Sequence, residues 1–215
     1  MDATAIIIAG GRSSRMGSDK ALLELGGLTV LERLIRELEP LASRIIIAAG
    51  DKEVYGAFGK EVVADLYPGA GPLAGLHAGL TSSASLWSMA VACDTPFANR
   101  GLFGALLERA AAAESGAAGA FGTGGTEAVI ARTEGRVHPL LAVYRRSVLP
   151  GLERRLQAGN LKMTAWTDAL KAEYAEGETL AAASGLPQEW CAFNMNRPED
   201  YDEARAWLGE SSDPA

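Results

Sequence analysis

The sequence predicts an α/β fold with a mostly parallel central sheet flanked by helices. An apolar run at residues 6–9 leads through a glycine-rich loop to an amphipathic helical pattern over 31–38, and a second apolar run follows at 44–50. This strand–helix–strand order places the two strands parallel, because the helix crosses back over the sheet. We expect one domain over residues 1–208 and a flexible C-terminal tail over 209–215.

The composition is that of a compact globule. The chain has 215 residues, of which 48% are hydrophobic and 22% charged, enough to bury a substantial core. Its net charge of −7 argues against a general nucleic-acid-binding surface, which needs clustered lysine and arginine. No apolar run approaches the ~20 residues that cross a bilayer and no signal peptide precedes the first strand, so we expect a cytoplasmic protein without membrane contacts.

The cysteines and histidines predict no zinc site. Cys93 and Cys191 each lie in an apolar stretch of strand character, and we expect both to be buried, reduced thiols. Together with His77 and His138 they do not form a zinc-binding spacing. His77 stands in a helical segment without a serine or cysteine partner at a recognisable spacing, so we interpret it as structural or solvated.

Local signals define the elements in the first half of the chain. Thr29 and Glu32 predict a capping box at the start of the first helix. The run at 44–50 suits a strand that is covered on both faces. A short strand is predicted over 61–65, and Pro72 suits the first position of the helix that follows.

The elements of the second half are shorter. Residues 87–93 predict a central strand, a long alanine-rich helix follows, and the Gly135 turn predicts a hairpin. The other predicted elements are strands at 117–121, 128–132, 139–144 and 190–193, and helices at 147–158 and 201–208. Asn196 suits the N-cap and Pro198 the first turn of the last helix, whereas residues 159–184 give no clear prediction.

The loop at residues 10–20 has the composition of a phosphate-binding loop. Three glycines, at positions 10, 11 and 17, remove the Cβ atoms that would keep backbone N–H groups away from an anion. Its charged residues are Arg12, Arg15, Asp19 and Lys20, three cations against one carboxylate. The spacing fits neither the P-loop nor the dinucleotide fingerprint. A turn with solvated arginines is the alternative interpretation.

Two carboxylates follow predicted strands, at the edge where open α/β sheets bind ligands: Asp65 and Asp94. Asp94 offers the hard oxygen ligand that Mg²⁺ prefers, with other positions left to water and phosphate. Lys20, at the end of the glycine-rich loop, can neutralise charge that develops on an α-phosphate or on leaving pyrophosphate. The alternatives are a helix cap for Asp94 and a surface lysine beside Asp19.

The loop resembles the L-A-x-G-x-S-x-R-M-G-x-x-K signature of nucleotidyltransferases, and its double glycine followed by R-S-S-R-M-G-x-D-K is similar to the MobA-type family of molybdenum cofactor guanylyltransferases. Three further segments resemble family motifs: residues 65–76 (D-…-G-P-L-A-G-[LIM]), 93–97 (C-D-x-P-[FY]) and 194–199 (N-x-N-[TS]-P-E). The resemblance covers residues 5 to about 208. Arg197 departs from the small hydroxyl residue of the last motif, and His138 precedes a Pro-Leu pair that the family also has.

The resemblance implies a three-layer, Rossmann-like nucleotidyltransferase fold and an enzyme that transfers GMP from GTP to the terminal phosphate of molybdopterin or Mo-molybdopterin, with release of pyrophosphate. It implies Mg²⁺ at Asp94 and transient contacts with molybdenum-insertion and acceptor proteins. The catalytic residues expected are Lys20, Arg15 and Asp94. The expected nucleotide- and substrate-binding residues are Ile8, Ala9, Gly10, Gly11, Lys20, Asp65, Gly71, Gly75, Asp94, Asn194 and Asn196.

Two other functions are compatible with the same motifs. One is a sister nucleotidyltransferase, such as a molybdopterin cytidylyltransferase or an enzyme that uses GTP on a phospholactate. The other is a nucleotide-binding regulator without turnover, against which the presence of both Lys20 and Asp94 argues. Turn chemistry alone would explain the glycines at 71 and 75, and helix capping alone would explain Asn196.

Overall fold

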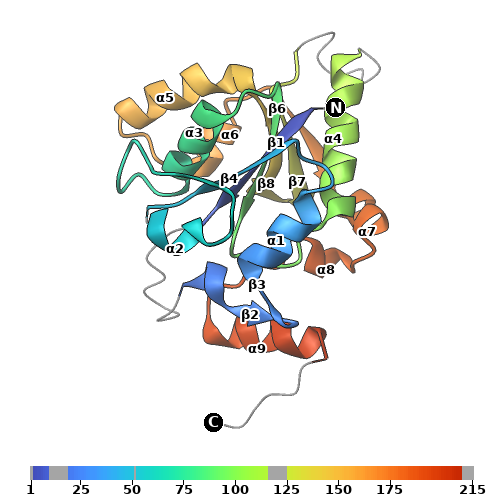
Figure 1. The fold of residues 1–215 in the computed structure, drawn as a ribbon. Helices are drawn as coiled ribbons and strands as arrows, with labels where there is room; N and C mark the ends of the chain where they lie inside the picture. Colours follow the sequence, from blue (N-terminus) through green and yellow to red (C-terminus); the bar gives the residue numbers. More distant parts are fainter. Residues whose placement is uncertain (1, 10–18, 51, 116–124, 210–215) are drawn as a thin grey trace.

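The computed structural model describes residues 2–9, 19–50, 52–115 and 125–209 (Figure 1). Its centre is a seven-stranded sheet of order β5-β4-β1-β6-β8-β7-β9. The strands are β1 Ala3–Ile8, β4 Arg44–Ala48, β5 Glu61–Val63, β6 Trp87–Ala92, β7 Ala128–Thr133, β8 Arg136–Arg145 and β9 Ala172–Glu176. Of the six neighbouring pairs, four are parallel and two, both made by β8, are antiparallel. The predicted α/β fold with a mostly parallel sheet is confirmed.

Helices cover both faces of the sheet and give three layers (Figure 1). On one face α1 (Val30–Leu38), α4 (Arg100–Glu114), α7 (Gly177–Ser184) and α8 (Gln188–Cys191) pack over residues such as Ile7. On the other face α3 (Pro72–Ser82), α5 (Leu149–Gln157) and α6 (Met163–Thr167) pack over Ile6 and Ile8. Successive isoleucines of β1 therefore enter opposite cores, as the two-residue period of a strand requires.

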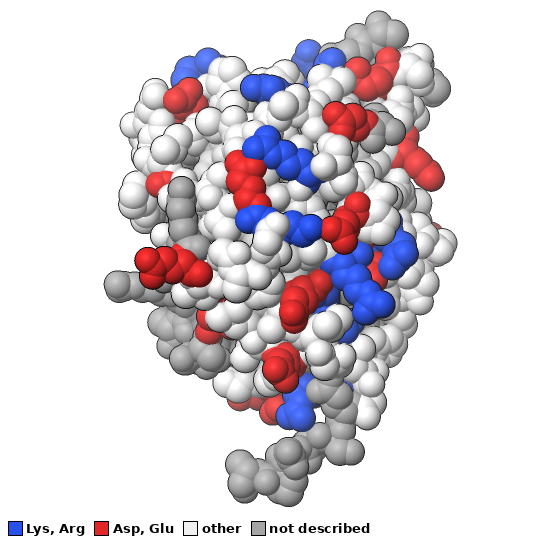
Figure 2. Space-filling view, in the orientation of Figure 1, with Lys and Arg blue, Asp and Glu red and all other residues white. Residues whose placement is uncertain are grey.

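The smaller elements connect or flank the strands and helices of the main layers. They are the 3₁₀ turns η1 (Lys20–Leu22) and η2 (Arg146–Val148), the two-stranded ribbon β2 (Glu24–Leu25) and β3 (Leu28–Thr29), and the helices α2 (Lys52–Gly56) and α9 (Pro198–Trp207). Within the described ranges, none of the helices combines the length and the apolar character that a membrane span requires. Figure 2 shows acidic and basic side chains intermingled on one face.

Several predicted local features are confirmed. Thr29 and Glu32 form the capping box of α1, and Pro72 is the first residue of α3. Glu134 (φ 50°) and Gly135 (φ 75°) form the two-residue turn between β7 and β8, where two positive φ angles match the twist of a hairpin.

Two predictions near the C-terminus are wrong. Residues 190–193 are not a strand: α8 ends at Cys191, because Trp190 and Phe193 pack as a compact turn against Phe97. Cys191 is buried as expected, but in a helix. The N-cap of α9 is Arg197 rather than Asn196, with Pro198 directly after it. The predicted strand at 117–121 lies outside the described residues.

The segment without a clear prediction supplies the edge of the sheet. It contains α6, β9 and α7, and β9 pairs in parallel with β7. The alternation of β9 is short and acidic, so its strand character depends on the hydrogen-bonding edge that β7 offers.

Candidate active site

The ends of three parallel strands place the first predicted site residues. The Ile8 carbonyl accepts from the Cys93 backbone N–H at 3.1 Å, and the Ala9 N–H donates to the Ala48 carbonyl at 2.9 Å. Ile8 and Ala9 thus lie between the carboxyl ends of β4 and β6, with Asp94 two residues after the end of β6. The other loop predictions, Gly10, Gly11 and Arg15, lie outside the described residues.

A chain of side-chain hydrogen bonds joins four predicted residues that are far apart in sequence. Lys20 Nζ donates to Asn196 Oδ1 at 2.7 Å, across 176 residues of chain. Asn196 Nδ2 donates to Asn194 Oδ1, and the Asn194 side chain in turn hydrogen-bonds the Asp94 carboxylate. We call Lys20, Asn196, Asn194 and Asp94 the lysine–aspartate relay. It brings the predicted cation and the predicted metal ligand into one site.

Backbone contacts hold the relay in place. The Met195 N–H donates to the Asp94 carbonyl at 2.7 Å, and the Met195 side chain is completely buried. Asp200 Oδ2 accepts from the backbone N–H groups of Asn196 and Arg197 at 2.7 and 2.8 Å, so the start of α9 is fixed as well. The two asparagine side chains therefore extend from a rigid segment.

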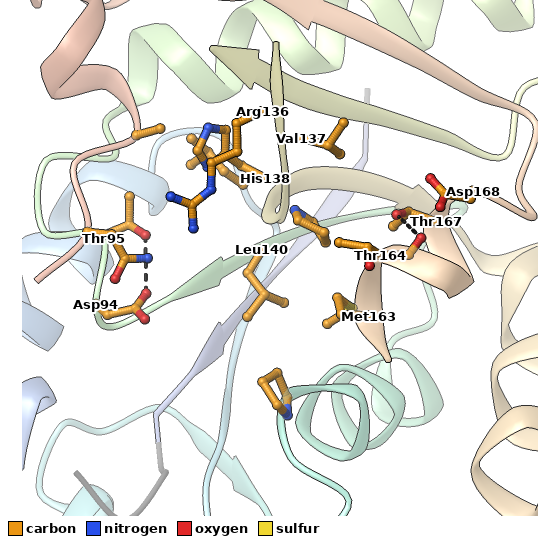
Figure 3. Close-up of a pocket in the computed structure, with 15 residues that line it drawn as sticks. Asp94, Thr95, Arg136, Val137, His138, Leu140, Met163, Thr164, Thr167 and Asp168 are labelled. Carbon is orange, nitrogen blue, oxygen red and sulfur yellow. Dashed lines mark hydrogen bonds between the residues drawn. The ribbon is translucent and has the colours of Figure 1, made fainter. Parts of the chain in front are cut away.

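Burial and charge act in opposite directions on Asp94. Burial raises the pKa of its carboxyl group, while the nearby Lys20 ammonium and the hydrogen bond from Thr95 Oγ1, at 3.3 Å, lower it (Figure 3). Burial also raises the pKa of the adjacent Cys93 thiol, which stays protonated and unreactive. A partly buried carboxylate of this kind gains by binding a cation.

Asp65 lies after β5 with one oxygen unsatisfied. Its Oδ1 is buried and has no hydrogen-bond partner among the described residues, and burial raises the pKa of its carboxyl group. Gly71, the N-cap of α3 directly before Pro72, has φ 68°, a conformation that favours glycine. A Cβ at Gly75 would lie 3.1 Å from Ile8 Cγ2, so α3 packs closely against β1 at this position.

His77 is 2% exposed and contacts the edge of the Tyr67 ring at a centroid distance of 5.2 Å. Burial lowers the pKa of His77, and the Glu153 carboxylate opposes that shift. His77 was expected to be either structural or solvated. Its burial excludes the solvated role, so the residue is structural.

A pocket of about 470 Å³ opens beside Asp94. Figure 3 shows Asp94 and Thr95 on one side of it and Thr164, Thr167 and Asp168 from the α6 region on the other. Leu140 and Met163 form its apolar middle. Asn194 also lines the pocket, so the lysine–aspartate relay and the pocket share a wall.

The upper wall of the pocket carries Arg136 and His138 from β8 (Figure 3). His138 Nε2 and Thr133 Oγ1 share a hydrogen bond of 2.7 Å, which orients the ring. Burial, with a smaller contribution from the Arg136 charge, lowers the pKa of His138 to about 4, so its ring is neutral at neutral pH. The wall thus offers one fixed positive charge and one neutral imidazole.

The residues present fit Mg²⁺ rather than a metal held entirely by protein. Among the described residues, no group of three or more His, Cys, Asp and Glu side chains is placed to hold a metal ion. Asp94 is a single hard oxygen ligand at the edge of a cleft, and Mg²⁺ commonly binds through one or two carboxylates, with water and substrate phosphate completing its shell.

Comparison with known proteins decides the family. The MobA-like NTP transferase domain matches residues 5–173. This chain belongs to that family. The MobA-like chain is 33% identical over 212 residues to a probable molybdenum cofactor guanylyltransferase of Pelotomaculum thermopropionicum, covering 99% of this chain and 96% of the relative. It is 34% identical to a molybdenum cofactor guanylyltransferase of Rhizobium meliloti, with 95% and 91% covered.

Solved structures agree with the family. The molybdopterin-guanine dinucleotide biosynthesis protein A of Archaeoglobus fulgidus superposes on this MobA-like chain with a TM-score of 0.77 at 25% identity, covering 96% and 98% of the two chains. The 2-C-methyl-D-erythritol 4-phosphate cytidylyltransferase of Thermus thermophilus, at 21% identity and a TM-score of 0.63 over 97% and 100%, shares the fold. The predicted family, and a nucleotidyltransferase as the kind of enzyme, are confirmed.

Sequence patterns missed part of the site of this MobA-like protein. Thr164, Thr167 and Asp168 fall in the segment that has no clear periodicity, and Arg136 looks like an ordinary exposed residue beside a turn. The pairing of β8 with β6 brings the Arg136 wall to the pocket, and α6 supplies the opposite side. The one available signal was the Pro-Leu pair after His138, which the family also has.

Proposed function

We propose that this MobA-like transferase is a molybdenum cofactor guanylyltransferase that moves GMP from GTP to the terminal phosphate of molybdopterin or Mo-molybdopterin, releasing pyrophosphate. The observation that carries the proposal is the lysine–aspartate relay beside a pocket at the carboxyl edge of the sheet. Phosphoryl chemistry needs charge neutralisation and alignment more than covalent catalysis, and the relay supplies a cation and a metal-binding carboxylate together.

The nucleotide occupies the side of the site that contains Asp65 and the start of α3. Asp65 Oδ1, buried and unsatisfied within the described chain, is an acceptor for a nucleoside N–H or hydroxyl group. The backbone at Gly71 and Gly75, at the start of α3, supports base contacts in this proposal. Gly10, Gly11 and Arg15 of the opening loop would hold the phosphates in this proposal.

The acceptor occupies the pocket. Its apolar middle, Leu140 and Met163, suits the flat ring system of a pterin, and polar groups at both ends provide orientation. The Arg136 guanidinium provides a positive charge on the wall for a phosphorylated acceptor. Entry from this side brings the acceptor phosphate to Asp94 and to the α-phosphate of GTP.

Lys20 stabilises negative charge on the α-phosphate and the leaving pyrophosphate, and Arg15 assists it. Asp94 would hold Mg²⁺, and that ion, when bound, neutralises charge on the nucleotide phosphates. Asn194 and Asn196 orient Asp94 and Lys20 through the relay. A cytoplasmic location and transient contacts with molybdenum-insertion and acceptor proteins stay predictions.

Nucleotide preference tests the proposal. Calorimetric titration of GTP, ATP and CTP in Mg²⁺ should rank GTP first, because an adenine leaves buried partners of the guanine edge unpaired at about 1–3 kcal/mol for each. Two such mismatches give at least about tenfold discrimination. Pyrophosphate release should require molybdopterin as well as GTP. Equal affinities for GTP and ATP, or a preference for CTP, would remove the guanylyl assignment.

A further inference from the structure

The residue before Lys20 is tied to the rest of the molecule through both of its carboxylate oxygens. Asp19 is the N-cap of η1, and its Oδ1 accepts from the Ala21 N–H at 3.0 Å. Its Oδ2 accepts from the Tyr55 hydroxyl group. One oxygen thus bonds the turn that contains Lys20, and the other bonds a side chain 36 positions away.

The side chain of Tyr55, which donates this hydrogen bond, is packed in the core. It lies in α2, is 3% exposed and belongs to the hydrophobic core on the α1 and α4 side of the sheet. Figure 1 shows α2 directly after β4, at the edge of the sheet. A packed tyrosine ring has few available rotamers, so its hydroxyl group has a fixed position relative to the sheet.

A helix cap alone does not need this arrangement. Capping requires one side-chain oxygen on a backbone N–H, which Asp19 Oδ1 already provides. The exposed carboxylate could leave its second oxygen to water, yet a buried tyrosine donates to it. The second bond holds the whole Asp19 residue, and with it the backbone from which the Lys20 side chain extends.

The position of that backbone decides where the ammonium group lies. A lysine side chain has four flexible carbons and loses about 2 kcal/mol of rotamer entropy when it is held. The Lys20 head is held by Asn196 at 2.7 Å, close enough to Asp94 to lower the pKa of that carboxyl group. Holding the base of the side chain as well reduces the number of conformations in which the ammonium group misses this place.

We infer that Tyr55 and Asp19 are positioning residues for nucleotidyl transfer, acting through Lys20. The inference rests on the proposed catalytic role of Lys20. In this inference neither residue touches the reacting atoms. The Tyr55 hydroxyl group fixes Asp19, Asp19 fixes η1, and η1 directs the Lys20 ammonium group to the lysine–aspartate relay. Misplacement of a catalytic group by about 1 Å can cost up to 10²-fold in rate, so loss of one anchor should lower kcat measurably.

The first experiment removes only the hydroxyl group. Tyr55→Phe keeps the packed ring, so the melting temperature should change little, while kcat for pyrophosphate release should fall about tenfold with the KM for GTP nearly constant. Tyr174→Phe is the matched control, because it deletes a tyrosine hydroxyl on β9, at the opposite edge of the sheet. The control should retain the parent kcat.

A double-mutant cycle with Lys20→Ala separates positioning from general structural damage. If Tyr55 acts through Lys20, adding Tyr55→Phe to Lys20→Ala should change kcat by less than about twofold. A further tenfold loss in that background would overturn the inference and leave the role of Lys20 intact. Unchanged kcat in Lys20→Ala alone would instead refute the proposed role of Lys20, and the inference with it.

Asp19 gives a second, independent test. Asp19→Asn can still accept from the Ala21 N–H and can share a hydrogen bond with Tyr55, whereas Asp19→Ala loses both contacts. Asp19→Asn should therefore keep most of the parent kcat, and Asp19→Ala should fall at least as far as Tyr55→Phe. Equal loss in the Asn and Ala variants would show that charge, not positioning, is what Asp19 supplies, and would overturn the inference.

Discussion

Replacing Asn196 with Ala should break the lysine–aspartate relay at its centre and leave the fold intact. The change deletes the Oδ1 acceptor of Lys20 Nζ at 2.7 Å and the Nδ2 donor to Asn194. The backbone N–H of residue 196 keeps its 2.7 Å bond to Asp200, so α9 begins as before. The variant therefore separates the orientation of the two proposed catalytic groups from folding.

The size of the effect follows from these two hydrogen bonds. A bond to a charged donor is worth about 1.5–3 kcal/mol when shielded, and the exposure of Asn196 reduces this to about 1 kcal/mol. The amide–amide bond adds about 0.5–1 kcal/mol. If the transition state loses about 1.5–2 kcal/mol of stabilisation because Lys20 and Asp94 are less well positioned, kcat falls about 10- to 30-fold. That is less than the loss of at least about 10²-fold expected for Lys20→Ala.

Single-turnover pyrophosphate release at saturating GTP, acceptor and Mg²⁺ measures this loss. Asn160→Ala is the matched control, since Asn160 is also exposed and its backbone N–H is also hydrogen-bonded, at 2.9 Å to the Arg155 carbonyl. Both variants should melt within about 2 °C of the parent. A folded Asn196→Ala protein with kcat within about twofold of the parent would refute the relay, and so would a loss confined to the KM for GTP.

Four other substitutions test the proposed metal ligand, a pocket histidine and a helix contact. Asp94→Ala should abolish transfer while the protein stays folded, and near-normal turnover in Mg²⁺ would contradict the metal assignment. Burial lowers the pKa of His138 from 6.5 to about 4. Between these two pH values the unfolded chain binds a proton at His138 and the folded chain does not, so the free energy of unfolding should fall as the pH drops from 6.5 to about 4. Allowing for partial exposure, the loss is about 1–2 kcal/mol, and His138→Gln should flatten it in urea titrations at pH 7 and pH 4.5. Gly101→Ala should destabilise the protein by more than about 2 kcal/mol, because the added Cβ would overlap the carbonyl oxygen of Ala183. Gly104→Ala, in the same helix but with open space around it, should stabilise the protein by about 0.5–1 kcal/mol. Similar melting temperatures for the two variants would contradict the packing of α4 on α7.

The roles proposed for the site residues could be predicted from the sequence because the motifs are local. Asp94 follows an apolar strand directly, and Lys20 ends a glycine-rich loop, so residue type and neighbours alone suggest their roles. The contacts among them were not visible. Lys20 and Asn196 are 176 residues apart, and no local pattern encodes a hydrogen bond across that distance.

Short apolar segments mark the limit of prediction for the fold. Residues 190–193 have the composition of a buried strand, but a buried helical turn has the same composition, and four residues are too few to show a period. Residues 172–176 have the opposite problem, since their acidic alternation resembles a solvated segment until β7 provides a partner. In both cases contacts with a neighbouring element determine the secondary structure of the segment.

The sequence by itself determined the elements whose stability is local: the capping box at Thr29, the helix that begins at Pro72 and the hairpin at Gly135, where the required hydrogen bonds and dihedral angles lie within a few residues. It also determined the residue types of the lysine–aspartate relay. Only the tertiary structure decided that α6 and β8 form a pocket beside Asp94, and that Tyr55 holds Asp19. The physical reason is that side chains from distant segments meet only after the sheet has set their register and the helices have packed on its two faces.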